Sequence, residues 1–159
     1  MTTNNVTRFL DSRKIAYTAY DLPAEKLGAE ETARILGVPL EIVFKTIVVL
    51  REKPGKPILA VVPGTGEVNL KAVASALGEK KVYLPTQVEA EKITGLQAGG
   101  ISLLALVNRG FTVLVDCSAL AHELIHISGG QRGLNIRLAV KALIELTNAR
   151  TADICQPAG

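Results

Sequence analysis

Apolar residues recur along this chain at two spacings, and the spacings predict an alternation of helices and strands. Near the N-terminus Val6, Phe9 and Leu10 stand at positions i, i+3 and i+4, which places them on one face of a helix. Four later segments are also expected to be helical, and a glycine directly follows three of them, a common way for a helix to end. The helices expected are residues 5–14, 29–36, 70–77, 87–94 and 140–147.

Short apolar runs rich in β-branched residues predict the strands. The clearest run is 43–50, and it is followed by 57–62 after a connection that contains Pro54-Gly55, a hairpin signal. These two strands are therefore expected to be adjacent and antiparallel. Further strands are expected at 16–22, 81–84, 112–116, 124–128 and 134–138, with a short turn or helix at 119–123. Residues 151–159 are expected to form a frayed tail.

Length and composition favour one domain over residues 1–150. The chain has 159 residues, of which 48 % are hydrophobic, enough for a core of ordinary size. No repeat, low-complexity tract or long linker marks a second domain. The fold class expected is mixed α/β (α+β), with a largely antiparallel sheet flanked by helices. Aromatic residues are only 4 %, which disfavours the base-stacking platforms of single-strand binders.

The charge is compatible with a nucleic-acid partner without requiring one. The formal net charge is +3, and the basic residues form only small clusters, at Lys80-Lys81 and at Arg132, Arg137 and Lys141. A solvated surface is the more common origin of any one such cluster.

Two cysteines, Cys117 and Cys155, are too few and too far apart for a disulfide framework or a zinc site. They indicate reduced thiols in a cytoplasmic protein. The N-terminus is polar and leads into no long apolar stretch, so neither a signal peptide nor a membrane span is expected. No residue cluster suggests a metal, nucleotide or organic cofactor.

Lys45 interrupts the most apolar strand of the chain. An ammonium taken out of water is costly unless it is paired or reaches a cavity. Lys45 therefore either lines a site that receives an anion or carbonyl, or lies on an edge strand and extends to solvent.

Two glycine-rich segments add candidate chemistry. Ala98–Ser102 contains Gly99-Gly100, where a ligand can approach the peptide N–H groups closely. Ile127–Gly133 offers a hydroxyl, free amides and a guanidinium within a few residues. Either segment also reads as a tight turn, and neither matches a phosphate-binding fingerprint.

Five motifs occur in a distinctive order: Phe44-Lys45-Thr46, Ala60-Val61-Val62-Pro63-Gly64, Asn69-Leu70-Lys71, Gly99-Gly100-Ile101-Ser102 and Ser128-Gly129-Gly130-Gln131-Arg132-Gly133-Leu134. In this order they resemble the YbaK-like family. That family contains free-standing aminoacyl-tRNA deacylases and the editing domain inserted in bacterial prolyl-tRNA synthetases. The resemblance covers roughly residues 3 to 148 and implies a sheet that curls toward a barrel.

The resemblance also implies a site. Its catalytic residues are expected to be Lys45, Gly100 and Ile101, with the glycine loop supplying N–H donors to a developing oxyanion. The residues expected to bind substrate are Tyr20, Gly99, Ser102, Ser128, Gly129, Arg132 and Asn135.

No protein nucleophile is evident. Ser102 and Ser128 lie outside a G-x-S-x-G motif, and His126 reads as a structural histidine within a strand. The resemblance accounts for this absence, because it implies that the substrate's own thiol attacks in family members that remove cysteine.

Two positions depart from the family pattern. The glycine loop of the family continues into proline, whereas Leu103 follows Ser102 here, so the loop is expected to be looser or reshaped. A position that is commonly acidic is Asn135, which keeps hydrogen bonding but loses the charge that holds an α-amino group.

The leading hypothesis is a trans-acting deacylase of misacylated tRNA(Pro), with Cys-tRNA(Pro) as substrate and substrate-assisted ester cleavage. An Ala-tRNA(Pro) deacylase that uses an activated water is the nearest alternative. A non-catalytic module that binds tRNA or a synthetase is a second, and a general small-ester hydrolase is a weaker third. The partners expected are tRNA(Pro) and, transiently, prolyl-tRNA synthetase, with no membrane and no metal.

Overall fold

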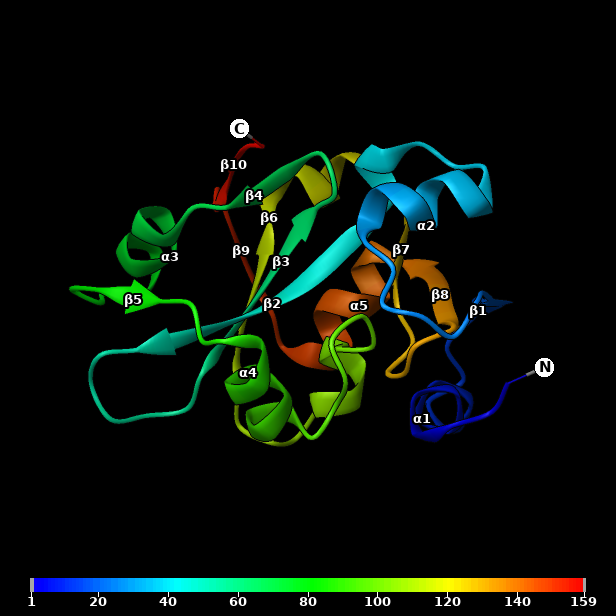
Figure 1. Ribbon diagram of the computed structural model, residues 1–159, viewed down its shortest axis with the longest axis horizontal. Coiled ribbons are helices and arrows are strands. Elements are labelled where there is room, and N and C mark those ends of the chain that lie inside the picture. Colours follow the sequence, from blue (N-terminus) through cyan, green and yellow to red (C-terminus); the bar gives the residue numbers. More distant parts are fainter. Residues whose placement is uncertain (1, 159) are drawn as a thin grey trace.

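Five α-helices lie within residues 2–158, the part of the chain that this computed structural model describes (Figure 1). Four have the bounds predicted from the sequence, and the first ends two residues earlier than expected. The helices are α1 (Asn5–Ser12), α2 (Ala29–Leu36), α3 (Leu70–Leu77), α4 (Gln87–Thr94) and α5 (Val140–Thr147).

Local chemistry fixes where these helices begin and end. Thr86 and Glu89 form a capping box at the start of α4, each side chain accepting a backbone N–H of the other. Gly37, Gly78 and Gly95 end α2, α3 and α4 in the left-handed conformation, which a residue with a Cβ adopts only at a cost. These are the three glycines that the sequence predicts to follow helices, and each of them ends its helix.

The strands form three sheets, with orders β5-β2-β3-β6-β9, β1-β8-β7 and β10-β4. Their bounds are β1 (Tyr17–Asp21), β2 (Phe44–Arg51), β3 (Ile58–Pro63), β4 (Gly66–Val68), β5 (Val82–Tyr83), β6 (Thr112–Asp116), β7 (Leu124–Ser128), β8 (Leu134–Ala139), β9 (Arg150–Ala152) and β10 (Cys155–Pro157). Only β3-β6 and β6-β9 pair in parallel, so the arrangement is mixed and largely antiparallel, as expected.

The β2-β3 hairpin has the predicted antiparallel pairing, with Phe44 opposite Pro63 and Val49 opposite Ile58. At its start β2 also meets the three-stranded sheet through a bridge between Val43 and His126. The two larger sheets therefore meet along β2 and β7, and the chain curls around the core between them (Figure 1).

Two apolar clusters fill the interior on opposite faces of the five-stranded sheet. The larger contains Phe44, Val48 and Leu59 with the inner faces of β7 and β8 and with α5. The smaller contains Val49 and Val62 with the buried face of α3. Because successive side chains of a strand point to opposite faces, both sides of β2 and β3 are covered, which explains their nearly continuous apolar sequence.

Three short 3₁₀ helices complete the described chain: η1 (Leu40–Ile42), η2 (Leu103–Leu106) and η3 (Cys117–Ala121). The last corresponds to the turn or helix expected at 119–123. No helix of residues 2–158 has the length and apolar character needed to cross a membrane.

The prediction of a frayed C-terminal tail is wrong. Strand β9 adds in parallel to β6, and β10 pairs with β4. Between them Ile154 is fully buried in the smaller cluster, and the Asp116 carboxylate accepts the N–H groups of Ile154 and Cys155. The tail therefore belongs to the fold up to Pro157, and Gly159 lies outside the described residues.

Candidate functional site

A pocket of about 440 Å³ opens beside the first half of β2. This half pairs with β3 on one side, whereas β5 joins the other side only at Leu50 and Arg51. The loop before α2, the turn into α4, the Ala98–Ile101 segment and the adjoining ends of β7 and β8 form the other walls. The volume lies in the range of small-molecule sites in proteins.

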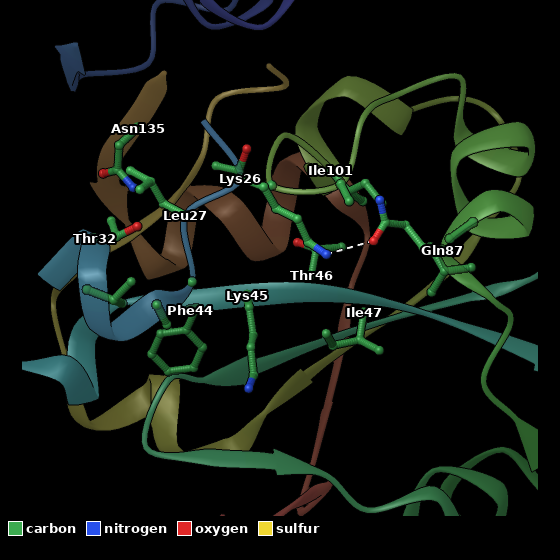
Figure 2. A pocket seen from close by; sticks show the side chains of 18 of the residues that line it. Lys26, Leu27, Thr32, Phe44, Lys45, Thr46, Ile47, Gln87, Ile101 and Asn135 are labelled. Atoms are coloured by element: carbon green, nitrogen blue, oxygen red, sulfur yellow. Dashed lines mark hydrogen bonds between the residues drawn. The ribbon is translucent and has the colours of Figure 1, made fainter. Parts of the chain in front are cut away.

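Lys45 and Thr46 both line this pocket but leave β2 in opposite directions (Figure 2). Thr46 points toward Ile101, and Lys45 points away from it. Within the described residues the salt bridges are Arg34–Glu31 and Arg51–Glu79, so the Lys45 ammonium is unpaired. Its nitrogen is accessible as well, because no buried side-chain N or O atom of residues 2–158 lacks a hydrogen-bond partner. Lys45 is therefore a free cation at the pocket wall.

The glycine loop presents two free backbone donors, and Gly100 is not one of them. The Gly100 N–H donates to the Gln97 carbonyl at 2.8 Å and closes a turn. Gly99 and Ile101 line the pocket, and their N–H groups have no acceptor among residues 2–158. The sequence-based assignment of a donor role to Gly100 is corrected accordingly, because its amide is already used.

Gly100 has a packing role instead. A Cβ built on it would lie 2.7 Å from the carbonyl carbon of Gln131 and 2.8 Å from the nitrogen of Arg132. The two glycine-rich segments therefore touch backbone to backbone at Gly100. Arg132 reinforces this contact, since its Nε donates to the Ala98 carbonyl at 2.7 Å. Arg132 joins the two loops and does not line the pocket.

Ser102 and Leu103 face the core. Ser102 is fully buried, and its hydroxyl accepts the Leu104 N–H at the start of η2. Leu103 is 1 % exposed and packs in the larger apolar cluster. The loop that lacks the family's proline is thus held by the Gly100 contact, the Arg132 bond and the anchoring of Leu103.

Tyr20, Asn135 and Ser128 stand opposite one another across β1, β8 and β7 and so share one face of that sheet. Asn135 and Ser128 line the pocket, whereas Tyr20 packs against the ring of His126 at 5.4 Å between centroids. Gly129, also predicted to bind substrate, is buried against Leu134 outside the pocket.

His126 orients the Asn135 amide. Its Nδ1 lies 2.8 Å from Asn135 Oδ1, and because an amide oxygen only accepts, Nδ1 carries the proton. Burial lowers the pKa of His126, opposed by the hydrogen bond to Asn135, and the charge of Arg137 lowers it further. Asn135 Nδ2 has no partner within residues 2–158 and is not buried, so it is available as a donor at the end of the pocket seen in Figure 2.

The structure brings together half of the predicted site residues. Lys45, Gly99, Ile101, Ser128 and Asn135 line the pocket, and Tyr20, Gly100, Ser102, Gly129 and Arg132 support it from outside.

Sequence reasoning missed the pocket's outer wall. Lys26 Nζ donates to Gln87 Oε1 at 2.6 Å and bridges the loop before α2 to the start of α4 (Figure 2). Glu25 and Thr32 also line the pocket. The signal available was the Thr86 capping box, which fixes where α4 and hence Gln87 begin.

Residues 24–146 match the model of the aminoacyl-tRNA editing domain family. The chain belongs to this family. A protein of Enterococcus faecalis, provisionally named Cys-tRNA(Pro)/Cys-tRNA(Cys) deacylase EbsC, is 36 % identical over 152 residues, which cover 94 % of this chain and 92 % of that protein. The resemblance stated from the sequence motifs and the enzyme class it implies, aminoacyl-tRNA deacylase, agree with this membership.

Two further comparisons place the editing domain in context. The proline-tRNA ligase of Limosilactobacillus fermentum is 28 % identical over 116 residues, which are 69 % of this chain but 20 % of the ligase. A solved structure provisionally described as a trans-editing enzyme for prolyl tRNA synthetase superposes with a TM-score of 0.80 at 23 % identity, covering 98 % of this chain and 99 % of that one. At this identity the likeness shows the fold, and it confirms the predicted mixed α/β class.

Proposed function

We propose that this protein is a free-standing editing deacylase that removes cysteine from misacylated tRNA(Pro). The observation that carries the proposal is a pocket with an unpaired cation and free backbone donors but no activated protein nucleophile. Within residues 2–158 the Ser128 hydroxyl accepts only the Gly130 N–H, at 3.4 Å, and no histidine or cysteine lines the pocket. Such a site selects and orients a substrate that supplies its own nucleophile.

Lys45 and Ile101 have separate roles in this proposal. The Lys45 ammonium, on one side of β2, binds the phosphate of the terminal nucleotide. The N–H groups of Gly99 and Ile101, on the other side of the strand, donate to the oxyanion that develops on the carbonyl oxygen. Asn135 Nδ2 donates to a further acceptor on the bound aminoacyl end.

The ester is cleaved without a protein-bound intermediate. The cysteine sulfur forms a bond to its own carbonyl carbon, the bond from that carbon to the ribose oxygen breaks, and the thiol proton passes to the ribose oxygen. The products are the free tRNA end and a cyclic thioester, which water opens to cysteine. Because the attacking atom belongs to the substrate, acyl groups without a thiol react slowly.

Glu25 favours one alternative, an Ala-tRNA(Pro) deacylase that uses water. Glu25 lines the pocket, and a carboxylate is the type of group that accepts a proton from an attacking water. In either case the chain acts in the cytoplasm, where tRNA is charged, and meets prolyl-tRNA synthetase transiently.

The experiment is time-resolved loss of the acyl group from Cys-tRNA(Pro), Ala-tRNA(Pro) and correctly charged Pro-tRNA(Pro). Wild type, Lys45→Ala, Glu25→Gln and the control Lys53→Ala, an exposed lysine of the hairpin, are compared. Loss of cysteine alone, abolished only by Lys45→Ala, supports the proposal. Loss of alanine that depends on Glu25 supports the alternative, and no loss from any substrate indicates a binding module.

A further inference from the structure

A second concave surface lies beside the pocket and is basic. This basic groove, about 600 Å³, is formed by α3, the turn after it and the end of the β2-β3 hairpin. Its charged lining residues are Lys71, Lys80, Lys81 and Glu52. Three cations thus face one carboxylate in a chain whose whole formal charge is +3.

The local ion pair leaves these lysines free. Glu79, the residue before Lys80, is paired with Arg51, and both side chains of that pair are largely buried. Lys71, Lys80 and Lys81 are exposed and take part in no salt bridge of residues 2–158. The neighbouring acid is therefore neutralised by a different cation, and the groove keeps its positive charge.

The groove and the pocket are neighbours along one segment. Val82 lines the groove, and Leu84 lines the pocket. Two residues of extended chain span about 7 Å. Tyr83, between them, is 45 % exposed and Leu84 is 50 % exposed, so the two form an apolar surface that connects the two concavities. Figure 1 shows β5 between α3 and α4, so the path runs from one to the other.

We propose that the basic groove binds the phosphates of the RNA strand whose aminoacylated 3′ end occupies the pocket. The inference rests on the proposed function, since it requires an RNA end in the pocket. The strand leaves the pocket across Tyr83 and Leu84, and its backbone then meets Lys71, Lys80 and Lys81. Lysines suit this role because phosphate contacts position an RNA without reading its sequence.

The test separates phosphate binding from chemistry. Lys71, Lys80 and Lys81 are all changed to glutamine, and Arg8, Lys14 and Lys141, exposed residues on α1, just after it and on α5, are changed to glutamine in a control of equal net charge. Binding of uncharged tRNA(Pro) is measured by fluorescence anisotropy from 50 to 300 mM salt. Cleavage is measured on Cys-tRNA(Pro) and on the cysteine ester of adenosine, which carries no phosphate.

The groove variant is expected to bind tRNA at least tenfold more weakly and to lose about 2 from the slope of log K against log salt, as three phosphate contacts predict. Its kcat/KM on Cys-tRNA(Pro) falls through KM, and its rate on the adenosine ester equals that of wild type. Equal tRNA binding by the groove and control variants overturns the inference. If the wild type cleaves neither substrate and the groove variant still loses tRNA binding, the proposed function is refuted. RNA binding by the basic groove is supported in that case.

Discussion

At the scale of single residues, the site depends on which polar atoms are already used. Ser128 and Asn135 face the same pocket, but the Ser128 hydroxyl has no base and the Asn135 oxygen is engaged by His126. An unactivated serine is a poor nucleophile at neutral pH. The residues that remain available are donors and a cation, which suits orientation of a substrate thiol.

Ser128→Ala is therefore expected to keep kcat/KM on Cys-tRNA(Pro) within about threefold of wild type, since truncating an unactivated hydroxyl removes no chemical step. If Ser128 were the nucleophile, its removal would lower the rate roughly 10⁶-fold. Single-turnover deacylation measures the difference, with Ser118→Ala, an exposed serine, as control. A loss above a hundredfold would contradict substrate-assisted cleavage.

His126 makes stability depend on pH. Because burial holds its pKa below the usual 6.5, the folded protein binds fewer protons than the unfolded chain between these two pKa values. The free energy of unfolding therefore falls as the pH drops from above 6.5 through the lowered pKa of the folded state. We expect urea titrations between pH 7.5 and pH 5 to show a smaller fall in His126→Gln than in wild type.

Glutamine suits this comparison because its amide N–H keeps a donor for Asn135 Oδ1 while it does not titrate. His122→Gln controls for the loss of one imidazole. An equal fall in His126→Gln and wild type would mean that other groups carry the pH dependence.

At the scale of elements, two loops far apart in the sequence act as one unit. The 98–102 and 127–133 segments touch where Gly100 meets Gln131, and Arg132 joins them through Ala98. This contact sets the position of the free Ile101 N–H. The loop geometry therefore depends on a close approach that only a residue without a Cβ permits.

Gly100→Ala is expected to lower kcat/KM at least tenfold and the free energy of unfolding by about 1–3 kcal/mol, because backbone atoms at 2.7–2.8 Å must move away from the new methyl group. Gln97→Ala is the matched control, since it leaves the carbonyl that accepts the Gly100 N–H. Denaturant titration and deacylation kinetics measure both effects. If the two variants had the same kcat/KM and the same free energy of unfolding, the close approach at Gly100 would not matter for activity or stability.

The helices and long strands were predictable because their signals are local. Four helices have the predicted bounds, and the β2-β3 hairpin follows from an apolar run on each side of Pro54-Gly55. The glycine loop and its candidate donors were also identified from the sequence, but the engagement of the Gly100 N–H was not. Which N–H is available depends on the turn bond from Gly100 to Gln97, and no residue pattern encodes that bond.

At the scale of the whole molecule, the missed elements are those that exist only through distant partners. Strands β4, β9 and β10 have three residues each and carry little apolar pattern. Their order comes from β6, from the β10-β4 pairing and from the buried Asp116, which is 38 residues away from Ile154. A short polar strand is not stable alone, so its sequence predicts a tail until its partners are known.

The C-terminal segment is therefore part of the folded structure, and the buried Ile154 side chain anchors it. Ile154→Ala removes a fully buried side chain from the smaller cluster and is expected to lower the free energy of unfolding by about 2–5 kcal/mol. Gln156→Ala, an exposed position of β10, is expected to change it by less than about 0.5 kcal/mol. Urea denaturation of the two variants beside wild type measures both values. Equal stability of the two variants would mean that the segment after β9 is not anchored, because in a frayed tail the side chain at 154 does not contribute to the free energy of unfolding.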